Sequence, residues 1–113
     1  MRARQIMRSQ GFTVAIALSV LTVALPCNAE PSVLAGKAFA RANCSHCHSI
    51  DKFTQSSLVI APPFRTLHLR YPVESLEEAL GEGIVTGHPS MPEFRLDPGQ
   101  VGDFIAFLKS LEP

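Results

Sequence analysis

The sequence predicts a small all-α domain over residues 30–113 of a 113-residue chain. Stretches with apolar residues at helical spacing recur between turns rich in proline and glycine. No stretch alternates polar and apolar residues for long enough to suggest a strand, and no internal repeat appears. We therefore expect one domain of three to five helices. A domain of this size is usually marginal without a disulfide, a metal or a cofactor.

Residues 1–29 have the organisation of a secretory signal peptide. Three basic residues come first: Arg2, Arg4 and Arg8. An uncharged apolar stretch follows over residues 12–25, and Cys27-Asn28-Ala29 is a small-residue cleavage site. We expect cleavage after Ala29 and a periplasmic protein. An uncleaved membrane anchor is the alternative, because the segment without charge is nearly long enough to span a bilayer; lipid attachment at Cys27 is a further one.

The first predicted helix covers Val33–Ala42. Pro31 and Ser32 are suitable first-turn and cap residues. Small and apolar residues follow at spacings of three and four: Gly36, Phe39 and Ala40. The helix therefore leads directly into the cysteine pair described below.

Two helices are expected in the middle of the domain. Pro63–Leu69 predicts a short one, which Tyr71-Pro72 interrupts. Pro72–Leu80 predicts a longer amphipathic one, with glutamates opposite an apolar face of Val73, Leu76, Ala79 and Leu80. Gly81 and Gly83 are expected to end it. Leu58–Ala61 is predicted to be an apolar loop.

The closing helix has the clearest start signal in the sequence. Asp97 is a good N-cap, Pro98 suits the first helical position, and Gln100 completes a capping-box pattern. Its apolar stripe consists of Val101, Phe104, Ile105, Leu108 and Leu111.

The segment Cys44-Ser45-His46-Cys47-His48 carries the chemistry. The C-x-x-C-H pattern is typical of covalent c-type haem attachment. Each thiol adds to one vinyl group, and the histidine that follows is delivered to the iron as proximal ligand. Three alternatives stay open. A thioredoxin-like redox pair lacks a preceding strand, a zinc site would need His68 or His88, and a disulfide would close a very short loop.

The chain resembles a small class I cytochrome c of the bacterial periplasmic kind from about Val33 to Leu111. The resemblance rests on the first helix, the attachment motif, Pro62-Pro63, Tyr71, Met91-Pro92 and the closing helix. It implies the cytochrome c fold, in which the N- and C-terminal helices cross closely and the helices surround one covalently bound haem c. Gly36 would permit that approach, with Phe39 and Phe104 or Phe107 packing around it.

The resemblance also implies an iron ligand set. Met91 is the expected distal ligand, and Pro92 restricts its backbone to an extended conformation. His88 is the rival for this position. His48 is the expected proximal ligand and should donate its other ring N–H to a backbone carbonyl.

Pro62 matches the position whose carbonyl serves this purpose in the family. Ala61 stands where the family often has glycine, which leaves open which carbonyl accepts. Arg65 and Tyr71 could pair with haem propionates or lie at the ordinary surface.

With both axial positions filled, the expected function is that of a one-electron carrier rather than an enzyme. The alternatives are a haem sensor or peroxidase-like protein with a displaceable sixth ligand, or a cytochrome subunit of a dehydrogenase or oxidase complex. All ten acidic residues lie in residues 30–113, which therefore carry a net charge of −3. We expect a monomer, without a membrane span after cleavage, and redox partners with basic docking patches. The domain lacks the basic cluster of a nucleic-acid binder.

Overall fold

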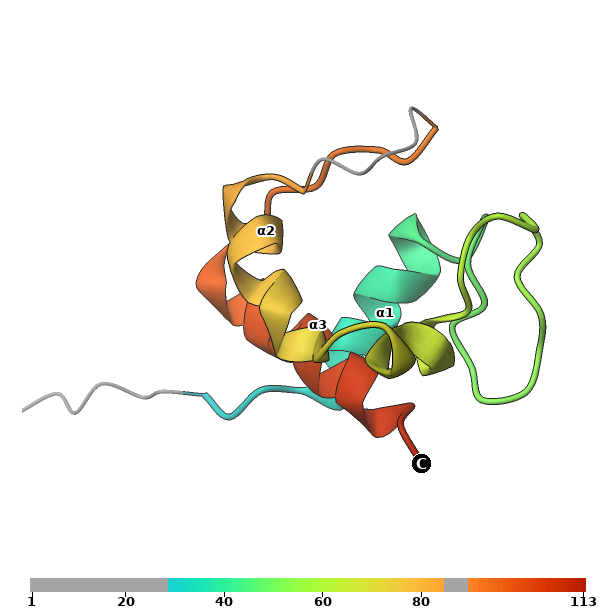
Figure 1. Cartoon of the computed structure of the whole chain (residues 1–113). Coiled ribbons are helices and arrows are strands. Elements are labelled where there is room, and N and C mark those ends of the chain that lie inside the picture. The colour runs from blue at the N-terminus through green and yellow to red at the C-terminus, as the bar shows by residue number, and fades with distance from the viewer. Residues whose placement is uncertain (1–28, 85–89) are drawn as a thin grey trace, which may run out of the picture.

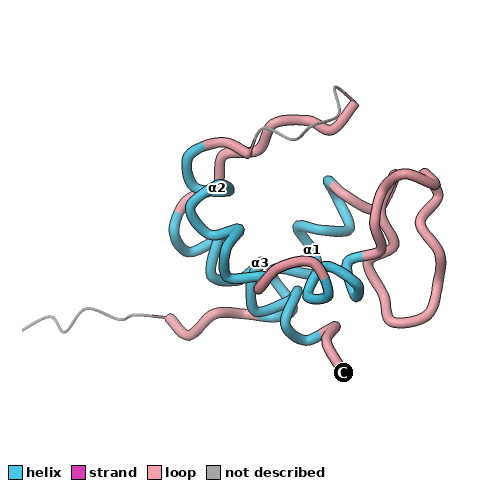
Figure 2. Tube along the Cα trace, viewed as in Figure 1, coloured by secondary structure: helices cyan, strands magenta, loops and turns pink. Residues whose placement is uncertain are grey.

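The computed structural model describes residues 29–84 and 90–113. They contain three α-helices and two short 3₁₀ helices: α1 (Val33–Asn43), η1 (Phe64–Leu69), η2 (Val73–Ser75), α2 (Leu76–Glu82) and α3 (Pro98–Ser110). No strand occurs within these ranges, and the predicted all-α class is confirmed (Figure 2). Within the same ranges no helix is long and apolar enough to cross a membrane. The predicted leader, except its last residue, lies outside the described residues.

Helices α1 and α3 cross at close range, as expected (Figure 1). The contact point is Gly36, which is buried. A Cβ atom placed there would lie 2.0 Å from the carbonyl oxygen of Asp103 and 2.8 Å from Cβ of Phe107. Only a hydrogen atom fits between the two backbones, so the identity of residue 36 sets the distance between the helices.

The N-terminus of α1 is tied to α3 as well as capped. The Ser32 hydroxyl accepts a hydrogen bond from the backbone N–H of Ala35 at 3.2 Å, as an N-cap should. The backbone N–H of Ser32 donates to Oδ1 of Asp103 on α3 at 2.6 Å. The helix begins at Val33 as predicted and runs one residue past the predicted end.

The predicted capping box at the start of α3 is confirmed. Oδ1 of Asp97 accepts from the Gln100 backbone N–H at 2.9 Å, and Oε1 of Gln100 accepts from the Asp97 N–H at 3.1 Å. All residues of the predicted apolar stripe are buried. Phe107 and Leu108 are 2% and 1% exposed and form the centre of the core against α1 and the 3₁₀ helices.

The predicted bounds of the middle helix are wrong at both ends. Pro72 precedes the 3₁₀ turn η2, and α2 then runs through Gly81 to Glu82. The helix ends at Gly83, whose φ of 112° favours glycine and whose N–H bonds to the Ala79 carbonyl at 3.0 Å. Gly81 lies inside the helix and does not have a positive φ. The expected face is correct in outline, since Val73 and Leu80 are buried.

Candidate functional site

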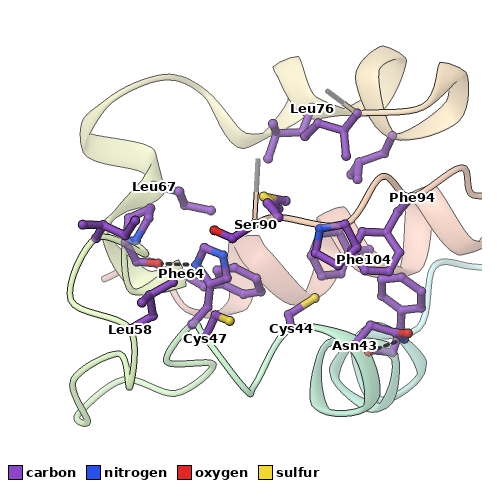
Figure 3. A pocket seen from close by; sticks show the side chains of 18 of the residues that line it. Asn43, Cys44, Cys47, Leu58, Phe64, Leu67, Leu76, Ser90, Phe94 and Phe104 are labelled. Atoms are coloured by element: carbon purple, nitrogen blue, oxygen red, sulfur yellow. Dashed lines mark hydrogen bonds between the residues drawn. The ribbon is translucent and has the colours of Figure 1, made fainter. Parts of the chain in front are cut away.

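A cavity of about 320 Å³ lies between the end of α1, η1, α2 and the segment that leads into α3. All five residues that the sequence singled out as cofactor or iron contacts line this cavity: Cys44, Cys47, His48, Pro62 and Met91. Figure 3 shows Cys44 and Cys47 on one side of it and Leu76 of α2 on the opposite side. The structure therefore brings together residues that are up to 47 positions apart in the chain.

The cysteines lie on a tight turn at the end of α1. The Cys44 N–H closes the helix by bonding to the Ala40 carbonyl at 2.8 Å. The N–H groups of Cys47 and His48 both bond to the Cys44 carbonyl, at 3.1 and 2.9 Å. No disulfide joins the two cysteines, and before a cofactor is attached burial raises the pKa of the Cys44 thiol to about 11.

His48 is oriented by one hydrogen bond and one ring contact. Its Nδ1 atom lies 2.8 Å from the carbonyl oxygen of Pro62. Because a carbonyl can only accept, Nδ1 carries the proton and Nε2 keeps its lone pair. The ring centroid lies 4.9 Å from that of Phe64. The imidazole is thus held in the tautomer that a metal ligand requires.

A connected row of aromatic rings forms one wall of the cavity. The ring centroids of Phe64 and Phe104 lie 5.8 Å apart, those of Phe104 and Phe39 5.5 Å, and those of Phe39 and Phe94 5.9 Å. Each pair packs edge to face. Phe64 and Phe94 were not predicted from the sequence. Phe64 directly follows Pro62-Pro63 and Phe94 lies two residues after Pro92, and these positions were the available signal. The wall is apolar, and its first ring, Phe64, contacts the imidazole of His48.

Met91 is half-buried at the cavity, on the segment between the end of α2 and α3. Two backbone bonds hold the following residues against α2: Ile84 N–H to the Phe94 carbonyl at 3.2 Å, and Leu96 N–H to the Leu80 carbonyl at 2.9 Å. The rival residue His88 lies outside the described residues.

The other two histidines lie away from the cavity lining. His46 is exposed. His68 is half-buried on η1, and its buried Nδ1 atom has no hydrogen-bond partner in the described part of the chain. Within residues 29–84 and 90–113, no three His, Cys, Asp or Glu side chains gather into a metal-binding cluster.

Comparison with known proteins gives one match. The family model named Cytochrome c matches residues 33–112. The chain belongs to the cytochrome c family. No curated protein and no solved structure matches it. Membership implies a covalently bound haem c as cofactor, electron transfer as the general activity and redox proteins as partners.

The residues of this cytochrome c fit that cofactor. The free thiols of Cys44 and Cys47 have the spacing for two thioether bonds. The imidazole of His48 has its Nε2 lone pair free, and a thioether lines the same cavity. Most of the remaining lining is apolar, which suits a largely apolar macrocycle, and its polar members are Asn43, Arg70, Tyr71 and Ser90.

Proposed function

We propose that this cytochrome c is a periplasmic one-electron carrier with His48 and Met91 as axial iron ligands and thioethers at Cys44 and Cys47. The single observation that supports it best is that these four side chains line one cavity, where Nδ1 of His48 lies 2.8 Å from the Pro62 carbonyl and Nε2 is left for a metal.

The ligand set explains why the function is transfer rather than catalysis. Bound haem supplies an iron that gains and loses one electron. The thiols of Cys44 and Cys47 would hold the group in place, and the imidazole of His48 and the thioether of Met91 would both bind its iron. No iron position would then be left for a substrate. The aromatic wall keeps water out, so that the surroundings rearrange little when the charge changes.

The charge of the domain suggests the chemistry of its partners. Residues 30–113 carry a net charge of −3, which favours redox partners with basic docking patches and association that weakens as salt is added. The charge is unevenly divided. Residues 30–70 hold five basic and two acidic residues, whereas residues 71–113 hold two basic and eight acidic ones. We therefore assign the docking of basic partners to the side that carries α2.

The ligand assignment is tested by substituting Met91. The ferric wild-type protein should show the weak long-wavelength sulfur-to-iron absorption band, and the reduced protein should bind carbon monoxide poorly near neutral pH. Met91→Ala should remove the band, lower the reduction potential and open the iron to carbon monoxide, while haem stays attached through acid-acetone extraction.

His88→Ala is the control and should leave the band and the potential nearly unchanged. If His88→Ala abolishes low-spin ligation, or if wild type binds carbon monoxide readily, the carrier assignment fails and a sensor or peroxidase-like function replaces it.

Export is tested separately. We propose that residues 1–29 are a cleaved signal peptide, so that intact-mass spectrometry of the periplasmic fraction should show a chain beginning at Glu30. A full-length species retained in the membrane fraction would contradict this and would favour an anchored subunit of a larger complex.

A further inference from the structure

Ser49, the residue directly after the proposed proximal ligand, is the buried polar residue of the described core and is 5% exposed. Each of its polar atoms is engaged. Its N–H donates to the Ser56 hydroxyl at 3.0 Å, and its carbonyl accepts from the Phe64 N–H at 3.0 Å. Its hydroxyl lies 3.0 Å from Oγ1 of Thr54. The backbone on the C-terminal side of His48 is therefore fixed by three separate bonds.

The direction of the hydroxyl bonds follows from Asp51. Its carboxylate accepts the hydroxyl proton of Thr54 and the backbone N–H groups of Thr54 and Phe53, the latter two at 2.7 Å. These hydrogen bonds, of which the two from Thr54 have the largest effect, lower the pKa of Asp51 to about 2. The Asp51 carboxylate is therefore an ionised acceptor at neutral pH. Because the Thr54 proton points to Asp51, Oγ1 of Thr54 accepts from the Ser49 hydroxyl.

Arg65 completes a hydrogen-bonded chain of defined polarity. Its Nη1 atom lies 3.4 Å from Oγ of Ser49 and also donates to the Thr54 carbonyl. A guanidinium can only donate, so the order runs from Arg65 through Ser49 and Thr54 to Asp51. The chain begins at a cation and ends at an anion, and each charge favours the same orientation of the two hydroxyls.

This series of hydrogen bonds is connected to the hydrogen bond that orients His48. The segments that contain His48-Ser49 and Pro62–Phe64 are linked twice, by Nδ1 of His48 to the Pro62 carbonyl at 2.8 Å and by the Phe64 N–H to the Ser49 carbonyl at 3.0 Å. Arg65 follows directly after Phe64 on η1. Because the two segments are joined at both points, a shift of Ser49 would be transmitted to the His48–Pro62 bond.

We propose that Arg65, Ser49, Thr54 and Asp51 are positioning residues that set the strength of the His48–Pro62 hydrogen bond and, through it, the reduction potential. This inference rests on the proposed ligation by His48. A ligating histidine whose second N–H is strongly hydrogen-bonded is a more basic ligand, which favours the ferric state. Loosening the chain should therefore raise the potential. The proposal also gives Arg65 a role within the loop, where it donates to Ser49 and Thr54. This role replaces the propionate contact that was one of the two possibilities from the sequence.

The test uses holoprotein variants of the exposed residue Thr54, which keeps global unfolding out of the result. Thr54→Val preserves shape and removes the hydroxyl link, and Thr54→Ser keeps it. The matched control is Thr66→Val. It removes a nearby hydroxyl that donates to the Pro63 carbonyl at 2.8 Å and takes no part in the hydrogen bonds from Arg65 to Asp51. Two quantities are measured in each: hydrogen exchange of His48 Nδ1–H by ¹⁵N NMR of the reduced protein, and the reduction potential.

Thr54→Val should speed exchange of the His48 Nδ1–H about tenfold. Loss of the Pro62 carbonyl, which accepts this hydrogen directly, would have a larger effect. It should also shift the ferrous–ferric equilibrium about threefold toward ferrous, roughly 30 mV at 59 mV per tenfold. Thr54→Ser should restore wild-type values, and Thr66→Val should leave both unchanged.

The proposal is overturned if Thr54→Val leaves the exchange rate and potential at wild-type values, or if Thr66→Val moves them equally. Failure of the ligation itself is separately visible, because wild type would then lack the low-spin spectrum and the sulfur band before any substitution in the loop.

Discussion

The helix crossing and the loop after the attachment motif support the same cavity by different physical means. At the crossing, Gly36 lets two backbones meet, and Phe107 and Leu108 fill the space beside them. The loop over residues 49–63 has little apolar burial of its own: Phe53 and Val59 are 87% and 95% exposed. It keeps its shape through polar bonds around Ser49 and Asp51.

The two regions differ in what they determine: the crossing determines the stability of the domain, and the loop determines the orientation of His48. Apolar packing at the crossing is expected to dominate the free energy of unfolding, because burial is the largest favourable term in folding. The polar bonds of the loop, exposed at Asp51 and partly buried at Ser49, contribute modestly to stability one by one, but they are directional. They are therefore suited to aiming His48 and Pro62 rather than to holding the domain together.

The largest effect is expected from Gly36→Ala, which breaks the crossing. Its Cβ would meet backbone atoms of Asp103, which cannot move aside as a flexible side-chain end could. Overpacking of this kind should lower the free energy of unfolding by about 3 kcal/mol, measured by denaturant unfolding of the holoprotein.

Gly81→Ala is the matched control for Gly36→Ala. It lies inside α2, where an added Cβ meets nothing within 4 Å. It should stabilise the protein by about 0.5–1 kcal/mol through the lower entropy of the unfolded chain. Equal unfolding midpoints for the two variants would show that the close approach of α1 and α3 does not limit stability.

The same contrast explains which features were predictable from the sequence. The capping box of α3 is local, because Asp97 and Gln100 are three residues apart and need no other part of the chain. The attachment motif is local as well. The resemblance to a known family supplied the crossing at Gly36 and the placement of Met91 and Pro62, which all lie in the expected regions of the structure.

The features that escaped prediction depend on distant residues or on small energy differences. The bond from Arg65 to Ser49 spans 16 positions, and nothing in either residue alone indicates the other. The division of the middle helix into η2 and α2 involves a single turn, for which 3₁₀ and α geometries differ little in energy. Gly81 and Gly83 are both acceptable helix ends from the sequence, and in the structure the C-cap is Gly83.

A smaller effect is expected when the loop is broken at Asp51. The unfolded carboxyl titrates near its ordinary pKa of 3.8, and the folded one near 2. Asp51 therefore contributes stability that is present above about pH 3.8 and is lost as the pH falls toward 2. Asp51→Asn should mimic the acid state at neutral pH, with a lower unfolding midpoint and faster chymotryptic cleavage after Phe53.

The control for Asp51→Asn is Asp103→Asn, which alters a carboxylate at the helix crossing that accepts the Ser32 N–H. It should leave cleavage after Phe53 at the wild-type rate. If both variants accelerate cleavage equally, the loop has no separate stability, and the distinction between the two regions fails.

The smallest effect is expected from the ion pair between Lys109 of α3 and Glu74 of η2, whose Nζ and Oε1 atoms lie 2.6 Å apart. Both side chains are about half exposed, so solvent and salt screen the pair. The hydrogen bond from Lys109 lowers the pKa of Glu74 below its ordinary 4.5, and the same bond raises that of Lys109 above 10.5. The contribution of Glu74 is thus present above about pH 4.5 and lost below it, whereas that of Lys109 is lost as the pH rises beyond 10.5.

Glu74→Gln should therefore lower the unfolding midpoint slightly at neutral pH and low salt, and progressively less as the pH falls below 4.5 or as salt is raised to about 1 M. Glu78→Gln, which removes an equal charge from an exposed position on α2, separates the pair from the general effect of net charge. Removing either acidic residue reduces the repulsion within an acidic region, so Glu78→Gln should leave the midpoint unchanged or raise it. A decrease for Glu74→Gln that persists in 1 M salt would mean that the contact depends on the short hydrogen bond from Lys109 to the Glu74 carboxylate rather than on screened charge attraction, because glutamine keeps the apolar stem of glutamate.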